Sequence, residues 1–148
     1  MIELIGDINL QNYMGEWLEI ARKPNFFQKT CQNSKAKYTL KYKGETPYIE
    51  IENFCQKENE ISSIKGKAKL NANRKLAVSF NFFMNLFNKT NYEIIFIDTK
   101  YKVAIVGSPN KKYLWILARE KLDKKTLQEL LKIAKERNFD ISDLIFDR

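Results

Sequence analysis

Short segments in which apolar and polar residues alternate recur along this chain, and they constrain its fold more than any other feature. In residues 34–42, Ala36, Tyr38 and Leu40 alternate with lysine and threonine residues. A period of two is typical of a β-strand with one buried and one solvated face. Comparable segments, separated by short polar breaks, predict eight consecutive strands at 17–22, 34–42, 48–55, 64–70, 76–82, 92–98, 101–106 and 113–119.

A helical pattern follows the last of these strands. Asp123 is a suitable N-cap, and Asn138 can end a helix in the left-handed conformation. Between them, apolar residues recur with the spacing of one helical face, at Leu127, Leu130, Leu131 and Ala134. Residues 139–146 are then expected to form a short final extended segment.

Eight strands in succession need a way to avoid exposed sheet edges. An open sheet leaves two edges unpaired, whereas an up-and-down antiparallel barrel pairs every strand with two neighbours. We therefore predict one all-β domain over residues 1–148. It is an eight-stranded up-and-down antiparallel β-barrel with a C-terminal α-helix packed outside it and a short final strand. A barrel of this size can hold one small ligand.

The composition excludes several kinds of site. The chain has no histidine and only two cysteines, which rules out histidine-based triads and histidine or thiolate zinc sites. Its five glycines are dispersed and form no phosphate-binding loop. We therefore expect no enzyme, no catalytic residue, no metal and no cofactor. No apolar run approaches the roughly 20 residues of a membrane-spanning helix.

The formal net charge of +8 raises the question of nucleic-acid binding. The outward lysines of segments 34–42 and 64–70 flank Glu50 and Glu52 on the strand between them. This arrangement is typical of cross-strand charge pairing. We therefore expect a solvated charged face and no nucleic-acid partner.

Gly15 and Trp17 open the first strand and predict the closed end of the barrel. Glycine accepts a positive φ or a close backbone approach, and tryptophan is the largest apolar side chain available to close an opening. Residues that share the inward face are expected to line the cavity. They are Glu19, Ala21, Tyr38, Leu40, Ile51, Asn53, Ala68, Val78, Phe80, Phe82, Ile94, Phe96, Tyr113 and Trp115.

Glu19 is the charged member of this set, and an isolated carboxylate is costly to bury. We favour a structural partner for it, such as a tyrosine or Asn53. The alternative is a contact with the polar group of a ligand.

The open end is expected opposite Trp17, and two of its loops carry apolar side chains. The apolar side chains of these two loops are Phe26, Phe27, Met84, Leu86 and Phe87. They would either fold over the opening as a lid or contact a membrane surface or a partner during ligand transfer.

Cys31 and Cys55 lie near facing positions of the hairpin predicted for segments 34–42 and 48–55, which turns near Gly44. We favour a disulfide between them over two free buried thiols. A disulfide would stabilise the fold by about 3 kcal/mol and would indicate an oxidising compartment.

Three motifs, in this order along the chain, resemble those of the lipocalin family, specifically the bacterial outer-membrane lipocalins related to apolipoprotein D. They are Gly15-x-Trp17, Asp98 with Tyr101, and Arg119 at the end of the last strand. The resemblance implies that Arg119 packs over Trp17 at the closed end in a cation–π contact.

The same resemblance implies that Ala104 and Val106 point into the cavity. It also implies a carrier or scavenger of fatty acids, lysophospholipids or similar lipids. Such a protein would act in the periplasm or at the outer membrane of a bacterium. Independently of the resemblance, we consider a homodimer as one oligomeric state.

Other functions and locations stay open at this point. The first residues lack the pattern of a secretory signal, so either a leader precedes the given sequence or the protein is cytoplasmic. The alternative functions are an isomerase or synthase that uses a cysteine in the barrel, and a partner-binding barrel whose interior is filled by side chains.

Overall fold

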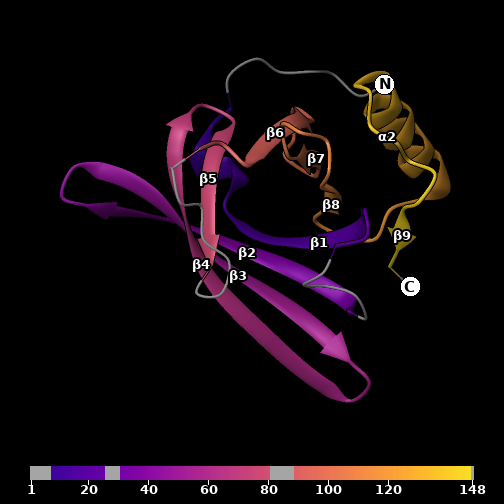
Figure 1. Ribbon diagram of the computed structural model, residues 1–148, viewed down its shortest axis with the longest axis horizontal. Helices are drawn as coiled ribbons and strands as arrows, with labels where there is room; N and C mark the ends of the chain where they lie inside the picture. Colours follow the sequence, from indigo (N-terminus) through magenta and orange to yellow (C-terminus); the bar gives the residue numbers. More distant parts are fainter. Residues whose placement is uncertain (1–7, 26–30, 81–88, 148) are drawn as a thin grey trace.

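The computed structural model describes residues 8–25, 31–80 and 89–147, and eight of its strands form a closed antiparallel barrel (Figure 1). Consecutive strands from β2 to β8 pair with one another, and β1 pairs with both β8 and β2, which closes the barrel. The strands are β1 (Gly15–Arg22), β2 (Gln32–Lys43), β3 (Thr46–Lys57), β4 (Glu60–Ala72), β5 (Lys75–Phe80), β6 (Tyr92–Ile97), β7 (Val103–Gly107) and β8 (Leu114–Ala118). The predicted fold class is confirmed.

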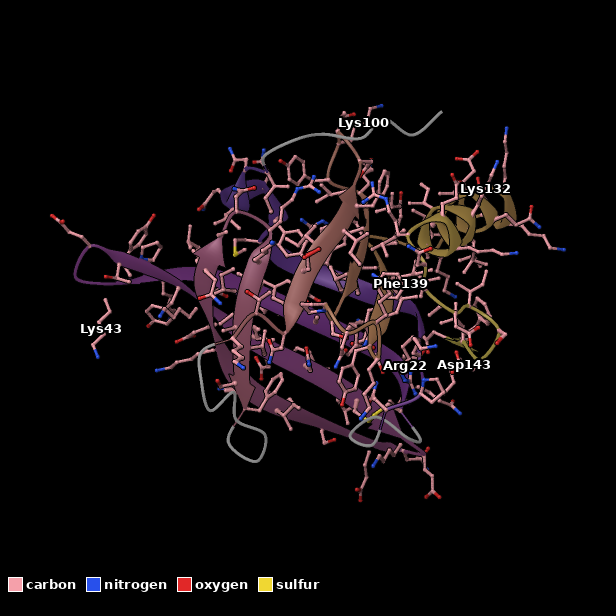
Figure 2. The ribbon with its side chains drawn as sticks, turned by 45° about the horizontal axis from the view of Figure 1, so that its top comes forward. Arg22, Lys43, Lys100, Lys132, Phe139 and Asp143 are labelled. Atoms are coloured by element: carbon pink, nitrogen blue, oxygen red, sulfur yellow. A yellow bond between two sulfur atoms is a disulfide. The ribbon has the colours of Figure 1, made fainter. Side chains whose placement is uncertain are left out.

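The strands differ in length, which gives the barrel an uneven outline. Strands β2, β3 and β4 have 12 or 13 residues each, longer than their apolar pattern predicted. Their hairpins project beyond the barrel on two sides in Figure 1, and Lys43 lies at the end of one of them (Figure 2). In contrast, β5 and β6 pair only through Lys75↔Glu93 and Leu76↔Tyr92 within the described residues.

The predicted charge pairing appears on the outer face of β2, β3 and β4. Lys41 Nζ lies 3.3 Å from Glu50 Oε2. In the strand register, Glu52 lies between Lys37 on β2 and Lys65 on β4. Such exposed pairs contribute little stability each, and their effect here is to offset part of the positive charge of this face.

Helix α2 (Lys124–Glu136) covers one outer face of the barrel. The side chain of Asp123 accepts a hydrogen bond of 2.8 Å from the backbone N–H of Thr126, as an N-cap should. Leu130 and Ala134 are fully buried against outward-facing residues of β6, β7 and β8. In Figure 2, Lys132 points away from the barrel. The predicted helix and its N-cap are confirmed.

The chain leaves α2 through Asn138, whose φ of +71° is in the left-handed region. Phe139 is buried between the helix and the barrel. Strand β9 (Ile145–Phe146) then pairs with Ala21 and Arg22 of β1. A short final strand therefore forms, although it covers only the end of the predicted extended segment.

A short helix, α1 (Leu10–Tyr13), precedes β1, and no helix was predicted there. Asn9 is its N-cap, with the side-chain oxygen accepting from the N–H of Asn12. The helix places Tyr13 beneath the barrel, where it is fully buried. The indole N–H of Trp17 donates to the carbonyl of Tyr13 at 2.8 Å. Tyr13 and Trp17 therefore close this end of the barrel together.

Arg119 holds the closed end from outside. Its guanidinium carbon lies 3.7 Å from the centre of the Trp17 ring. The same group donates to three backbone carbonyls: those of Tyr101 at 3.1 Å, Glu16 at 2.8 Å and Asn12 at 2.8 Å. One side chain thus connects α1, the start of β1 and the turn between β6 and β7. The predicted packing of Arg119 over Trp17 is confirmed.

Two other motif residues shape the backbone around this contact. Gly15 has a φ of +99°, and a Cβ atom at this position would lie 3.5 Å from Arg119 Nη1. Asp98 Oδ1 accepts hydrogen bonds from the backbone N–H groups of Lys102 at 2.7 Å and Val103 at 3.0 Å. These bonds form the β6–β7 turn that presents the carbonyl of Tyr101 to Arg119.

We expect Arg119→Lys to lower the free energy of unfolding by about 2 kcal/mol. A lysine keeps the charge, but its ammonium group cannot stack on the indole and donate to three carbonyls arranged around a plane. Urea denaturation followed by circular dichroism measures the loss. Arg137→Lys, at an exposed position, is the matched control, and an equal effect of both substitutions would contradict the assigned role.

The predicted disulfide is confirmed. Cys31 and Cys55 are bonded to each other, with their Cα atoms 5.1 Å apart. The bond joins the residue just before β2 to the last part of β3. It therefore crosses the open end of the β2–β3 hairpin, opposite its turn.

We expect the double substitution C31S/C55S to lower the free energy of unfolding by about 3 kcal/mol, because the unfolded chain loses a closed loop. Urea denaturation measures this change. Thiol titration of the unreduced, denatured wild-type protein should detect no free thiol. Two reactive thiols per chain, or unchanged stability of the double variant, would show this expectation to be wrong.

Candidate functional site

The barrel interior contains a cavity of about 80 Å³. Most of the strands contribute inward-facing residues to its wall. The lining residues are Glu19, Tyr38, Ile51, Asn53, Val78, Phe80, Asn91, Tyr92, Val106, Tyr113, Trp115 and Leu117. Nine of these twelve belong to the set predicted from the sequence.

Four other predicted cavity residues lie inside the barrel without lining this cavity. Ala68, Ile94 and Ala104 are buried in the same interior cluster, and Leu40 packs against its edge. Their inward orientation agrees with the alternation of their strands. Phe82 lies outside the described residues, as do the predicted mouth residues Phe26, Phe27, Met84, Leu86 and Phe87.

The prediction that Ala21 and Phe96 line the cavity is wrong. Both side chains belong to the cluster between the barrel and α2. The strand register shifts between Glu19 and Ala21 on β1 and between Ile94 and Phe96 on β6. A β-bulge adds one residue and reverses the alternation beyond it. A residue two positions after an inward-facing residue therefore faces outward when a bulge lies between them.

Three lining residues, Asn91, Tyr92 and Leu117, were not predicted, although the sequence contained a signal for two of them. Tyr92 lies two residues before Ile94, and Leu117 lies two residues from both Trp115 and Arg119. Strand alternation therefore predicts that each shares a face with these residues. Asn91 lies in a polar break before β6. Its side chain exchanges two hydrogen bonds with the backbone of Val78, at 2.8 and 2.9 Å. Asn91 therefore connects β5 to the start of β6, where the two strands share few backbone pairs. This role depends on the folded barrel and has no pattern in the sequence.

The wall of the cavity away from Trp17 is aromatic. Tyr113 and Trp115 stack with their ring centres 5.9 Å apart. Phe80 faces Gly66 on β4 at such close range that a Cβ atom on this glycine would lie 2.5 Å from the Phe80 ring. Gly66 thus leaves room for the Phe80 ring beside the cavity.

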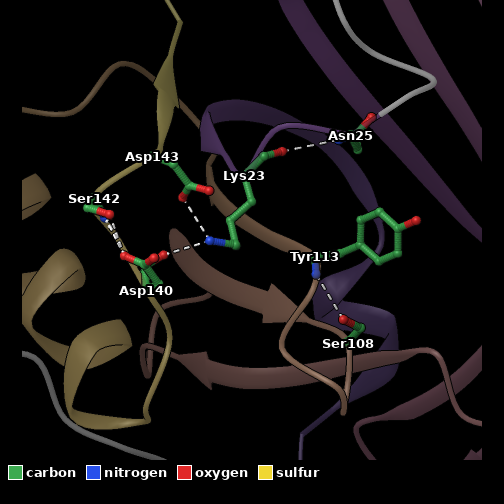
Figure 3. A network of polar contacts seen from close by, with 7 residues as sticks. All are labelled: Lys23, Asn25, Ser108, Tyr113, Asp140, Ser142 and Asp143. Carbon is green, nitrogen blue, oxygen red and sulfur yellow. Dashed lines mark hydrogen bonds and ion pairs between the residues drawn. The ribbon is translucent and has the colours of Figure 1, made fainter.

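Polar contacts next to Tyr113 fix this part of the barrel, as Figure 3 shows. The N–H of Tyr113 donates to Ser108 Oγ at 2.9 Å. On the neighbouring strand end, Lys23 Nζ donates to the carbonyl of Asp140 at 2.9 Å and pairs with Asp143 at 2.7 Å. The end of β1 is therefore bound to the segment between α2 and β9.

Three tyrosine hydroxyls meet at the floor of the cavity. Tyr92 shares one hydrogen bond with Tyr13 and another, of 3.0 Å, with Tyr38. The rings of Tyr13 and Tyr38 stack with centres 5.3 Å apart. Tyr38 and Tyr92 line the cavity, and Tyr13 lies beneath them. The floor is therefore polar, although the walls above it are largely apolar.

Burial raises the pKa of all three tyrosines. The pKa of Tyr38 is raised to about 12, mainly by burial and further by the nearby charge of Glu19. The pKa values of Tyr13 and Tyr92 are also raised well above 10.0, chiefly by burial. These side chains therefore remain neutral hydrogen-bonding groups at physiological pH.

Glu19 adds a carboxylate to this polar region. It lies on β1 two residues after Trp17, lines the cavity and is 4 % exposed. Its charge contributes to the raised pKa of Tyr38. The predicted inward orientation of Glu19 thus agrees with the structure.

A second concavity, of about 750 Å³, lies outside the barrel between β1, the β3–β4 hairpin, α2 and β9. We call it the outer groove. Its apolar lining includes Leu18, Phe54, Leu127 and two exposed side chains, Ile61 and Phe146. The groove is separate from the interior cavity and was not predicted.

Comparison with known proteins identifies the family. The family model of the lipocalin-like domain matches residues 8–148. The chain belongs to the lipocalin family. Members of this family bind small hydrophobic ligands, and the cavity described above lies in the interior of this lipocalin's barrel.

Curated relatives of this lipocalin come from different kinds of organism. It is 37 % identical to a putative lipocalin of Acanthamoeba polyphaga mimivirus, over 95 % of this chain and 84 % of the relative. It is 27 % identical to the outer membrane lipoprotein Blc of Vibrio cholerae, over 98 % of this chain and 85 % of that protein.

Among solved structures, this lipocalin resembles insecticyanin from the tobacco hornworm Manduca sexta. The TM-score is 0.72 and the sequence identity is 20 %, with 100 % of this chain and 84 % of the other chain covered. At this identity the likeness concerns the fold alone.

The described residues contain no cluster of three or more histidine, cysteine, aspartate or glutamate side chains able to hold a metal ion. In the same part of the chain, no helix is long and apolar enough to cross a membrane.

We expect the stability of this lipocalin to fall as the pH rises from about 10 to about 12. The folded tyrosines keep protons that the unfolded chain releases above its tyrosine pKa near 10. Their contribution is therefore complete below pH 10 and is lost as the pH approaches the raised pKa of Tyr38, about 12. Urea denaturation across this range measures the slope.

The same experiment has a matched pair of variants. Tyr38→Phe should make the decline shallower by up to about 1.4 kcal/mol per pH unit. Tyr42→Phe, at a position 62 % exposed, should leave the slope unchanged. Identical slopes for wild type and Tyr38→Phe would contradict the expectation.

Proposed function

We propose that this lipocalin binds and carries a single-chain lipid, such as a fatty acid or a lysophospholipid, in its barrel cavity. The observation that carries the proposal is the interior cavity, which is walled by apolar and aromatic side chains above a floor closed by Tyr13 and Trp17. Affinity would come from apolar burial, at about 0.8 kcal/mol per methylene. The protein would act without catalysis.

The size of the cavity sets a condition on this binding. Pockets for drug-sized ligands usually measure about 300–1,000 Å³, whereas the cavity here is about 80 Å³. An acyl chain would therefore need aromatic side chains such as Phe80, Tyr113 and Trp115 to change rotamer on binding. Side-chain rearrangement of this kind is common when ligands bind.

The structure bears differently on the two alternative functions considered from the sequence. An isomerase or synthase with a reactive cysteine loses its nucleophile, because both cysteines of the chain are in the disulfide. A partner-binding barrel with a filled interior gains support from the small cavity volume. Ligand titration separates this second function from lipid carriage.

We also propose a location in a bacterial envelope, in the periplasm or at the outer membrane. The disulfide supports an oxidising compartment, and the relatives from Vibrio cholerae and Escherichia coli are outer membrane lipoproteins. Membrane contact through the mouth loops and homodimer formation remain predictions.

We expect saturable binding of saturated fatty acids by isothermal titration calorimetry, with about fourfold tighter binding for each added methylene until the cavity is full. Val106→Trp should weaken binding at least tenfold, because its side chain occupies the cavity. Thr39→Trp, on the exposed face of β2, should bind like wild type.

Two further controls make the titration decisive. Val106→Phe is a milder variant in case the tryptophan prevents folding, which circular dichroism would reveal. Ile61→Glu alters the outer groove at a residue 73 % exposed and should not change the affinity. Absence of saturable binding to wild type would favour the filled barrel, and loss of binding only in Ile61→Glu would place the ligand in the outer groove.

A further inference from the structure

We propose that the outer face of β2, β3 and β4 is a docking surface for a bilayer that contains anionic phospholipid. This face lies outside the barrel and is separate from the interior cavity, so the proposal does not depend on what the barrel binds. It has two rows of lysine, a hollow lined by both rows and one exposed apolar side chain on a hairpin. We call the following residues the basic face: Lys35, Lys37, Lys41, Glu50, Glu52, Ile61, Lys65, Lys67 and Lys69.

The strand register places the lysines in two parallel rows. Three lysines of β2 and three of β4 are exposed, and the residues that alternate with them face the interior. Strand β3 lies between the rows and contributes Glu50 and Glu52 to the same face. Neighbouring strands lie about 4.8 Å apart, so the rows run about 10 Å apart. Six positive side chains against two negative ones leave a net charge of +4 here, half of the chain's formal +8.

The two glutamates offset only part of this positive charge. Lys41 forms a salt bridge with Glu50, and among the described residues this is the one ion pair on the basic face. Glu52 lies between two lysines in the register, but its Oε2 accepts a hydrogen bond from Ser63 Oγ at 3.1 Å. Most of the exposed ammonium groups are therefore available to an anionic partner.

The basic face is hollowed across its lysine rows. The hollow measures about 760 Å³, and Thr39 and Ser79 line it together with four of the lysines and both glutamates. A phospholipid head group carries a phosphate, which lysine binds as a point charge. The two hydroxyl groups can donate to phosphate oxygens as well. The hollow therefore provides space and donors for head groups that project from a bilayer.

An exposed apolar side chain favours a bilayer over other anionic partners. Ile61 is 73 % exposed and lies on the β3–β4 hairpin, which projects beyond the barrel in Figure 1. It is on the same side of the sheet as Lys65 and Lys67, because residues two apart on a strand share a face. Surfaces that bind at the membrane interface combine basic side chains with apolar ones that enter the lipid. Single-stranded nucleic-acid binders use aromatic side chains instead, and none is exposed among the described residues of this face.

Vesicle flotation of the wild-type protein tests the docking surface. With phosphatidylcholine vesicles that contain about 30 % phosphatidylglycerol, at about 0.05 M salt, we expect binding at least about tenfold tighter than to phosphatidylcholine alone. Raising the salt concentration to about 0.3 M should weaken this binding at least about fivefold, because salt screens exposed charges.

A matched pair of lysine variants assigns the binding to the basic face. Lys65→Gln/Lys67→Gln should weaken vesicle binding at least about tenfold, because each lysine near an anionic surface adds to the attraction. Lys100→Gln/Lys132→Gln makes the same charge change at two exposed lysines elsewhere on the protein (Figure 2). Its affinity should stay within about twofold of wild type, because salt screens charges that lie away from the membrane. Circular dichroism verifies that each variant is folded.

A second pair tests the apolar contact. Ile61→Ser should weaken vesicle binding roughly fivefold, because a side chain that enters the lipid is lost. Tyr42→Ser is the control, since Tyr42 is 62 % exposed on the other projecting hairpin. Tyr42 follows Lys41 directly on β2 and therefore lies on the opposite side of the sheet. This variant should bind like wild type.

Three results would overturn the proposal. The first is failure of wild type to bind anionic vesicles at low salt; a dimer that Ile61→Ser disrupts would then assign the basic face to a second copy of the chain. The second is an equal loss of binding in the two lysine variants, because net charge alone would then explain it. The third is tighter binding to a DNA duplex than to the vesicles, with the same dependence on Lys65 and Lys67, which would assign the face to nucleic acid.

Discussion

The contact between Arg119 and Trp17 is the interaction on which the closed end of the barrel depends. The planar guanidinium lies over the indole ring and donates to carbonyls of three separate segments. These carbonyls lie where the regular strand pairing ends, so they need a donor from another element. With this end closed by Trp17 and Tyr13, the cavity can extend only toward the opposite end of the barrel. We therefore expect a ligand to enter from the end of the barrel opposite Trp17.

The interior combines two kinds of surface with different effects on binding. Apolar walls stabilise any buried chain roughly in proportion to its area, and so they discriminate weakly between ligands. Polar groups discriminate strongly, because a mismatched partner leaves a buried donor or acceptor unsatisfied. In this barrel, the tyrosine cluster places hydroxyl groups at the floor, and Glu19 is a further polar residue of the cavity lining. The walls would therefore supply most of the affinity for a lipid.

Much of the fold could be predicted because its causes are local in sequence. Alternation identified the strands, and the Asp123 cap and apolar spacing identified α2. The errors have equally specific causes. Ala21 and Phe96 follow β-bulges that reverse the alternation, and a bulge leaves little trace in the sequence. Helix α1 has only four residues and offers no apolar period, so its role depends on Tyr13 fitting beneath the barrel.

The sequence by itself determined the antiparallel barrel and its closed end, and it placed Cys31 close enough to Cys55 to favour a disulfide. A period of two, a few motif residues and a hairpin register are enough for these, since each concerns neighbours along the chain or along one ladder. Only the tertiary structure decided the size of the cavity and the polarity of its floor. Both depend on side chains from β1, β2, β6 and α1 that meet after the barrel closes. A local sequence pattern does not predict how side chains from such distant segments pack together.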